Sequence, residues 1–231
     1  MKTIGLIGGM SWESSLEYYR IINKTVKEKL GELHSCKCIM YSVDFAEIER
    51  LQHEGEWDQL TVQLIDIAGK LENAGAEILV ICTNTMHKMA DEIQQNIEIP
   101  VLHIVDATAE EIKKKKLRSV GLLGTRFTME QDFYKGRLKE KHGIDVIVPD
   151  EREREIVHTI IYNELISGII KDDSRKVFQN VIGNLKRQGA GGVILGCTEI
   201  PLLIKEEDSD IPLFDTTTLH ARKAVELALS Q

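Results

Sequence analysis

Cysteine is scarce in this sequence, and the cysteines present are not spaced as metal ligands. There are four in 231 residues, without a CxxC motif and without a Cys/His cluster of zinc-ligand spacing. Cys36 and Cys38 lie two residues apart on an expected strand, so their side chains point the same way. We expect these two thiols to pack in a core or at a sheet edge, and we predict no metal site.

Long apolar runs are also absent, and so is a recognisable targeting segment. No stretch approaches the ~20 apolar residues that a membrane helix requires. Met1-Lys2-Thr3 leads directly into an expected strand, with no signal peptide before it. The sequence therefore predicts a soluble protein of the reducing cytoplasm, with no membrane partner.

Basic residues are outnumbered by acidic ones. The formal net charge is −8 and the pI is near 5.5, which argues against a nucleic-acid partner. The one basic run is Lys113-Lys114-Lys115-Lys116, just ahead of an expected strand. We interpret this run as the solvated end of a helix rather than as a contact for a polyanion.

What the sequence does contain is a regular alternation of short apolar runs and helical periodicity. Between the apolar runs, apolar residues recur every three or four positions, as they do in amphipathic helices. Strands that alternate with helices predict parallel sheets with right-handed crossovers, so the expected fold class is α/β. The expected strands cover residues 3–7, 39–43, 99–103, 118–124, 144–148 and 211–215, together with one strand that runs to Cys82 and one that ends before Cys197.

The two halves of the chain repeat one another. Three glycine- or proline-marked segments correspond, with Gly5 aligned to Gly121, Gly75 to Gly189 and Pro100 to Pro212. The offsets are 116 (121 − 5), 114 (189 − 75) and 112 (212 − 100), which indicates a duplicated α/β unit. We expect residues 1–107 plus 213–231 to form a first α/β domain and residues 108–212 to form a second. The last helix, from residue 217 to 229, is expected to pack back on the first half.

Polar or thiol side chains follow two matching strands of these halves. Thr83 and Cys197 occupy equivalent positions, because their separation is also 114 (197 − 83). The carboxyl ends of parallel strands are where open α/β sheets bind ligands. We therefore predict a site built by two facing groups, one from each half.

Cys197 is the strongest candidate for chemistry. A helix with Pro201 in its first turn is expected to follow it, and the positive end of that helix should lower the thiol pKa and supply a thiolate base. The alternative is a buried, inert cysteine. Glu199, two residues further on, either polarises this second site or simply caps the helix.

Thr83 is the matching group in the first half, and its hydroxyl is a very poor base unaided. It can cap the helix, donate to a carboxylate, or hold a water that carries the proton. Asn84 and Thr85 add amide and hydroxyl donors at the same helix start, while Cys82 should point to the other side of the strand, into the core. His87 lies one helical turn beyond and either assists or orients Thr83, or is a surface or capping histidine.

Two glycine turns stand at equivalent places in the two halves. Gly5-Leu6-Ile7-Gly8-Gly9 lacks the full GxGxxG spacing and an acidic residue placed for a ribose, so a small anion is favoured over a dinucleotide. Gly124-Thr125-Arg126-Phe127-Thr128 offers hydroxyls and a guanidinium that can help to hold a carboxylate. The alternative for this second segment is a capped helix start with a surface arginine.

Taken together, these motifs resemble those of the aspartate/glutamate racemase superfamily. The resemblance runs over nearly the whole chain and is closest to the aspartate racemase branch and to the broad-specificity amino-acid racemases of enteric bacteria. The segments that carry it are Gly8-Gly9-Met10-Ser11-Trp12, Thr83-Asn84-Thr85-Met86-His87, Gly124-Thr125-Arg126-Phe127-Thr128-Met129 and Gly196-Cys197-Thr198-Glu199.

The resemblance implies two pseudo-symmetric domains, each with a mainly parallel four-stranded sheet flanked by helices. It implies an active site in the cleft between the domains and a homodimer. It also implies racemisation of a small amino-acid substrate without pyridoxal phosphate, any other cofactor or a metal.

In that superfamily two cysteines face the substrate α-carbon from opposite sides, so the resemblance makes Cys197 and Thr83 the catalytic residues. Most relatives have cysteine where this chain has Thr83, and we therefore expect slow, broad racemisation. Arg50 and Arg126 are candidates for meeting the side-chain carboxylate of the substrate. The implied substrate contacts are Met10, Gln52, Thr83, Asn84, Thr85, Thr125, Arg126, Thr128 and Thr198.

Three functions follow from these patterns. The first is a two-base racemase that interconverts L- and D-aspartate, L- and D-glutamate or similar amino acids. The second is a single-cysteine decarboxylase or isomerase of the same superfamily, because one cysteine can protonate from one face only. The third is a non-catalytic amino-acid-binding protein, for which Cys197 would be dispensable.

Overall fold

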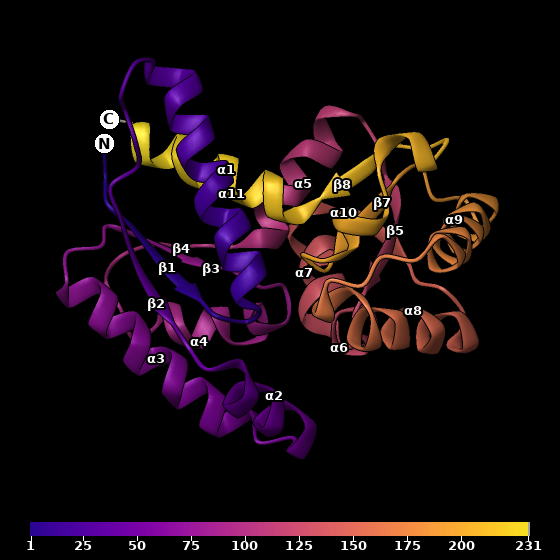
Figure 1. The fold of residues 1–231 in the computed structure, drawn as a ribbon, viewed down its shortest axis with the longest axis horizontal. Coiled ribbons are helices and arrows are strands. Elements are labelled where there is room, and N and C mark those ends of the chain that lie inside the picture. The colour runs from indigo at the N-terminus through magenta and orange to yellow at the C-terminus, as the bar shows by residue number, and fades with distance from the viewer. Residues whose placement is uncertain (231) are drawn as a thin grey trace. The chain divides into compact units, whose positions relative to one another are not determined.

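Two four-stranded parallel sheets, each flanked by helices, make up the computed structural model, which describes residues 1–230 (Figure 1). A first unit contains Met1–Ile104 together with the chain from His220 on, and a second contains Val105–Leu219. The strand orders are β2-β1-β3-β4 and β6-β5-β7-β8, so the two sheets have equivalent topologies. The predicted fold class and the predicted duplication of an α/β unit are therefore confirmed.

The first unit alternates strands and helices from its first residues. Met10 and Ser11 lie in the turn after the first strand, and Ser11 caps the first helix by accepting from the Ser14 backbone N–H at 3.4 Å. The elements are β1 (Ile4–Gly8), α1 (Trp12–Leu30), β2 (Cys38–Ser42), α2 (Phe45–Glu54), α3 (Trp57–Asn73), β3 (Ile78–Ile81), the 3-10 helix η1 (Thr85–Met89), α4 (Ala90–Gln94) and β4 (Val101–Leu102).

Both faces of the first sheet are buried, because successive residues of a strand point to opposite faces. Leu6 packs in the cluster that includes α1 and α11 (Thr216–Leu229), whereas Ile7 packs in the cluster that includes α2 and α3. Figure 1 shows α1 and α11 on one side of the strands and α3 and α4 on the other. Strands covered on both faces explain the continuous apolar runs in the sequence.

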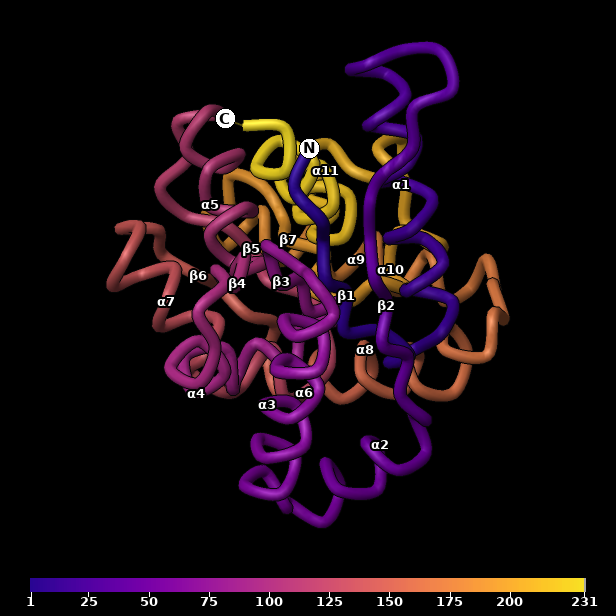
Figure 2. Tube along the Cα trace, turned by 90° about the vertical axis from the view of Figure 1, so that its left-hand side faces the viewer, coloured from indigo at the N-terminus to yellow at the C-terminus, as the bar shows by residue number. Residues whose placement is uncertain are grey.

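The two ends of the chain meet in this unit. The Lys2 backbone N–H donates to the Ala228 carbonyl oxygen at 2.8 Å, and Figure 2 shows the N-terminus next to α11. His220, on α11, is fully buried and ties three segments together. Its Nε2–H donates to the Leu102 carbonyl oxygen at 2.8 Å, so its Nδ1 accepts the Tyr18 hydroxyl at 2.8 Å.

Acid should destabilise this unit through His220. Burial, reinforced by nearby His87, lowers the pKa of His220 from 6.5 to about 3. The unfolded chain therefore binds a proton between about pH 6.5 and 3 that the folded chain does not. The stability that the neutral ring contributes is complete above about pH 6.5 and is lost as the pH falls towards 3, by roughly 4–5 kcal/mol in total.

Urea unfolding at several pH values measures this effect. Both tryptophans, Trp12 and Trp57, lie in the first unit, so their fluorescence follows its unfolding. We expect His220→Gln to be less stable at pH 7.5 but to lose about 1.4 kcal/mol less per pH unit than the wild type between pH 6 and 4. Equal slopes for the two proteins would contradict the prediction.

The second unit repeats the pattern on its own core. Leu123, Val193 and Leu195 face the helices α8 and α9, while the intervening Leu122 and Ile194 are buried on the other face. The elements are α5 (Ile104–Lys114), β5 (Ser119–Gly124), α6 (Arg126–Glu130), α7 (Asp132–His142), β6 (Asp145–Ile147), α8 (Glu151–Asn163), η2 (Leu165–Ser167), α9 (Asp172–Arg187), β7 (Val193–Gly196), α10 (Ile200–Leu203), η3 (Glu206–Asp208) and β8 (Leu213–Asp215).

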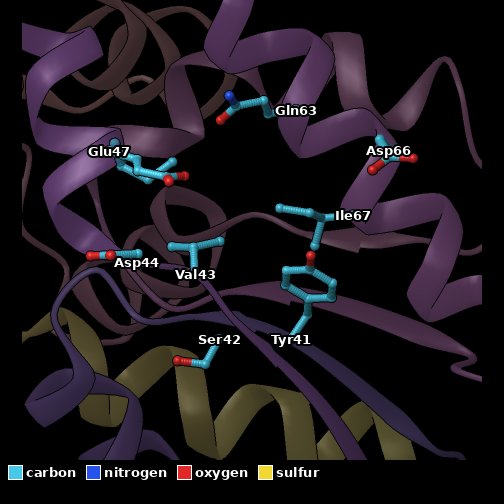
Figure 3. A pocket seen from close by; sticks show the side chains of 9 residues that line it. Tyr41, Ser42, Val43, Asp44, Glu47, Gln63, Asp66 and Ile67 are labelled. Atoms are coloured by element: carbon cyan, nitrogen blue, oxygen red, sulfur yellow. The ribbon is translucent and has the colours of Figure 1, made fainter.

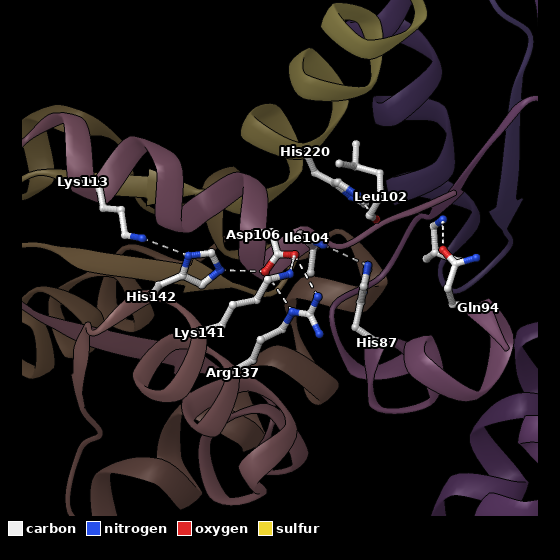
Figure 4. Close-up of polar contacts among 11 residues, drawn as sticks. His87, Gln94, Leu102, Ile104, Asp106, Lys113, Arg137, Lys141, His142 and His220 are labelled. Carbon is white, nitrogen blue, oxygen red and sulfur yellow. Dashed lines mark hydrogen bonds and ion pairs between the residues drawn. The ribbon is translucent and has the colours of Figure 1, made fainter. Parts of the chain in front are cut away.

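A charged cluster joins α5 to α7 within this unit (Figure 4). Asp106 accepts two hydrogen bonds from Arg137, at 2.9 and 2.8 Å, and one each from Lys141 at 2.6 Å and His142 at 2.7 Å. Burial alone would raise the pKa of Asp106, but these donors outweigh it and hold that pKa well below its usual range. Asp106 therefore stays ionised and anchors the first turn of α5.

The expected division of the chain differs from the observed one at residues 105–107 and 213–219. We predicted that residues 213–231 belong to the first domain, but β8 pairs in parallel with β7, with Leu213 opposite Val193. The unit boundary falls inside α11, after Leu219. Hydrogen bonding between strands decides this assignment, because β8 completes the second sheet as β4 completes the first.

Candidate active site

Thr83 follows β3 at the carboxyl edge of the first sheet, beside the turn that follows β1. The two strands pair in parallel, and the Cys82 backbone N–H donates to the Ile7 carbonyl oxygen at 2.9 Å. The Ser14 hydroxyl reaches the Cys82 carbonyl oxygen at 3.5 Å. Cys82 itself is fully buried in the core under α1, as expected from the alternation of the strand, whereas Thr83 is only half-buried.

His87 holds the backbone of Thr83 in place. The Ile104 backbone N–H points at His87 Nε2 at 3.2 Å, so this nitrogen is an acceptor and carries no proton (Figure 4). The proton is therefore on Nδ1, which donates to the Thr83 carbonyl oxygen at 2.8 Å. A neutral imidazole with both nitrogens engaged cannot exchange protons with Thr83, so of the open alternatives the orienting role is the one that the geometry supports.

Two further histidines surround His87. Its ring centroid lies 4.8 Å from that of His103 and 5.4 Å from that of His220, and all three side chains are buried. The interpretation of His87 as a surface histidine is therefore wrong. The cluster links the Thr83 turn to the start of α5 and to α11, which gives the turn a rigid support.

The other residues of the first unit that were predicted to contact the substrate lie in different local environments. Asn84 and Thr85 are buried at the start of η1, next to Thr83. Met10 is buried in the core cluster beneath α2 and α3. Gln52 is buried on α2. This helix follows β2, the strand that pairs with β1 in the sheet. Arg50 is exposed and paired with Glu54.

Cys197 follows β7 at the carboxyl edge of the second sheet, next to the turn after β5. Gly124 pairs with Gly196, and a Cβ added at Gly124 would lie 2.9 Å from the Gly196 carbonyl oxygen. Two glycines are therefore needed for the strand ends to approach. Thr125 caps α6 by accepting from the Thr128 N–H at 3.4 Å, and both threonines are buried.

The Cys197 thiol donates a hydrogen bond to the Glu199 carboxylate, with Sγ 2.9 Å from Oε2. The Thr198 hydroxyl donates to the same oxygen at 2.7 Å. Burial, followed by the charge of Glu199, raises the pKa of Cys197 well above that of a free thiol. Thiol and carboxylate thus form a buried donor–acceptor pair.

The prediction that a helix start lowers the pKa of Cys197 is wrong. Pro201 is in the first turn of α10, as expected, but this helix has only 4 residues and its dipole is correspondingly small. Desolvation and the adjacent carboxylate dominate instead. Cys197 is therefore a thiol in the resting enzyme, and its proton has an acceptor within hydrogen-bonding distance.

In this structure the Arg126 guanidinium is paired with another side chain and is not available to bind an anion. Its guanidinium is paired with Glu155 of α8, and its backbone N–H donates to His158 Nδ1 at 3.3 Å. Both charged side chains are about half exposed, so the pair contributes little to stability. Use of Arg126 for a substrate carboxylate stays a prediction that requires this pair to open.

The sequence matches the family described as Asp/Glu/Hydantoin racemase over residues 7–224. The chain belongs to this family. A broad specificity amino-acid racemase of Bacillus subtilis is 29% identical over 177 residues, which are 75% of this chain and 74% of that protein. The predicted superfamily is therefore confirmed.

Solved structures agree with this membership over the full length. A protein of Yersinia pestis, provisionally assigned as an Asp/Glu racemase, is 56% identical with a TM-score of 0.95, and 100% of each chain is covered. An aspartate racemase homologue of Pyrococcus horikoshii is 39% identical with a TM-score of 0.87 over 100% of each chain. These likenesses are consistent with the aspartate branch of the family.

One polar residue at the second sheet edge was missed in the sequence. Thr217 follows β8 and is buried, and its Oγ1 has no hydrogen-bond partner among the side chains that the structure describes. β8 is next to β7, so Thr217 and Cys197 stand at the same edge of one sheet. The Thr216-Thr217-Thr218 run directly after an expected strand was the available signal.

A surface pocket of about 230 Å³ lies at the end of β2, between α2 and α3 (Figure 3). Its lining includes the carboxylates Asp44, Glu47 and Asp66. An acidic pocket repels a dicarboxylate amino acid. The geometry therefore favours the sheet edges rather than this pocket for racemase chemistry.

Two kinds of feature are missing from residues 1–230. No three His, Cys, Asp or Glu side chains of this stretch gather in a way that could hold a metal ion. Nor does this stretch contain a helix long and apolar enough to cross a membrane.

Proposed function

We propose that this racemase-family protein interconverts the L and D forms of aspartate, glutamate or a similar small amino acid without pyridoxal phosphate or a metal. The observation that carries the proposal is the buried Cys197 thiol at the end of β7, hydrogen-bonded to Glu199. Family membership supports the same chemistry. Relatives named as a broad-specificity amino-acid racemase, a glutamate racemase and an aspartate racemase homologue point to aspartate, glutamate or a broader range of amino acids.

Cys197 is the proposed base for the L enantiomer. The ammonium group of a bound amino acid favours the thiolate, since an opposite charge nearby stabilises the ionised form. Glu199, 2.9 Å from the sulfur, is placed to take the thiol proton and to return it.

Thr83 is the proposed second group, acting on the opposite face of the α-carbon directly or through a water that its hydroxyl holds. Its half-buried side chain and its fixed backbone suit a positioning role for water. A threonine is a much weaker acid and base than a cysteine. We therefore expect slow inversion and comparatively fast α-proton exchange from one enantiomer.

Neutral donors are proposed to grip the α-carboxylate. Asn84 and Thr85 stand beside Thr83, and Thr125 and Thr128 stand beside Cys197 at their respective sheet edges. Such donors also favour the carbanion, because negative charge spreads onto the carboxylate oxygens when the α-proton leaves.

Proton NMR in D₂O tests the proposal directly, with L-aspartate and L-glutamate as substrates and optical rotation followed alongside. A racemase replaces the α-proton by deuterium and lowers the rotation towards zero. A decarboxylase of the same superfamily would release carbon dioxide, and a binding protein would do neither. Absence of exchange with every small amino acid would refute the racemase proposal.

Glu199→Gln separates a proton-accepting role for Glu199 from a purely electrostatic one. Removing the charge should lower the pKa of Cys197 and speed its alkylation by iodoacetamide at pH 8. We nevertheless expect α-proton exchange to fall roughly tenfold or more, because the thiol proton loses its acceptor. Faster alkylation together with faster exchange would show that Glu199 only holds the thiol protonated.

A homodimer and a cytoplasmic location complete the proposal. The first rests on the family resemblance and the second on the composition of the sequence. Sedimentation equilibrium of the purified protein and fractionation of expressing cells test the two statements separately.

A further inference from the structure

Two thiols and a thioether lie along one face of β2, away from the candidate active site. Cys36 lies two residues before the strand, Cys38 begins it and Met40 follows two residues later. Alternate residues of an extended segment share a face, so the three sulfur atoms are on the same side. Cys38 and Met40 both line a surface pocket of about 430 Å³ that α1 covers on its other side.

The sulfur groups are already close to one another and partly exposed. The Cys36 thiol donates to the Lys37 carbonyl oxygen at 3.2 Å, the neighbouring Cys38 thiol raises the pKa of Cys36, and both side chains are half-buried. Cys36 is also fixed to α1, because its backbone N–H donates to Asn23 Oδ1 at 2.9 Å. The Met40 sulfur lies over Gly8 of β1, inside the same layer between sheet and helix.

We propose that Cys36, Cys38 and Met40 form a binding site for a soft monovalent metal ion, with Cu(I) as its representative. Thiolates and thioethers are the ligands that select Cu(I), whereas Zn²⁺ requires four ligands in a tetrahedron. Two or three sulfur atoms on one strand face suit the low coordination number of a monovalent ion. Binding releases the two thiol protons, so that each sulfur donates an electron pair to the metal.

The surroundings favour this ion over a hydrated divalent cation. The pocket is walled by Trp12, Leu16 and Tyr19 of α1 and contains no carboxylate. An apolar wall shields a Cu(I)–thiolate centre from water and gives an oxygen-preferring cation no ligand. Trp12 in this wall also provides a reporter, because a bound metal next to an indole quenches its fluorescence.

Anaerobic titration with Cu(I) in competition with a chromophoric Cu(I) chelator tests the site. We expect one Cu(I) per chain and quenching that Trp12→Phe removes. Cys36→Ser and Cys38→Ser should each weaken binding by about 100-fold or more, and Met40→Leu by roughly tenfold. A variant with Cys82→Ala and Cys197→Ala, which keeps only the β2 thiols, should bind like the wild type.

Circular dichroism confirms that each variant is folded, and X-ray absorption of the copper complex should show sulfur-only coordination. The proposal is overturned if Cys36→Ser and Cys38→Ser bind Cu(I) as tightly as the wild type. It is also overturned if binding disappears with Cys82 and Cys197. Neither result depends on racemase activity.

Discussion

Cys197→Ser should lower α-proton exchange from L-aspartate and L-glutamate by about 10³-fold or more. Serine keeps the size of the side chain and the hydrogen bond to Glu199, which the thiol makes at 2.9 Å. A serine hydroxyl is a far weaker acid than a thiol, so it cannot supply the base. The measurement is the loss of the α-proton NMR signal in D₂O at matched enzyme concentration.

Cys82→Ala is the matched control, because it removes the other thiol that follows a central strand. Cys82 is buried on the core side of the first sheet and has no place in the proposed chemistry. We expect this variant to be less stable but to keep exchange within a few-fold of the wild type. Exchange by Cys197→Ser at a rate near that of the wild type would disprove the role of Cys197.

Thr83→Cys should raise the rate of inversion by about 10²-fold, because a thiol replaces a hydroxyl at the second proton-transfer position. The backbone at residue 83 is held by His87 through its carbonyl oxygen, so the side-chain change leaves the support intact. Exchange from the L enantiomer should rise less, since that step rests on Cys197. Optical rotation and deuterium incorporation, measured together, separate the two rates.

Thermodynamics provides an internal check on this variant. Two enantiomers in water have equal free energy, so kcat/KM must be equal in the two directions for the wild type and for Thr83→Cys. Thr83→Ser is the matched control, because it keeps the hydroxyl and should invert at a rate close to the wild type. Inversion that does not increase in Thr83→Cys would mean that another group delivers the second proton.

Much of the fold followed from the sequence because its signals are local. The run that ends at Ile81 and the run that ends at Gly196 both became central strands of their sheets. Apolar strands and amphipathic helices are recognisable within a dozen residues, since each must bury its own apolar side chains. The duplication was visible for the same reason, as one local pattern repeated with nearly constant spacing.

The pairing of strands, by contrast, could not be predicted from local sequence patterns. Leu213 lies opposite Val193, 20 residues earlier in the chain, because β8 and β7 are joined by hydrogen bonds. No local sequence pattern shows which of the two sheets β8 joins. The result moved residues 213–219 out of the domain that we expected. Thr217 was missed at the same point, because only the position of β8 brings it to the sheet edge with Cys197.

The sequence alone determined the α/β class, the repeated unit and the placement of Thr83 and Cys197 at the ends of matching strands, because strand ends are encoded where apolar runs stop. Only the tertiary structure decided what these residues can do. The thiol of Cys197 stays protonated through burial and the Glu199 carboxylate, and His87 becomes a neutral support through Ile104. Protonation states depend on desolvation and on neighbours brought together by folding, which no local pattern records.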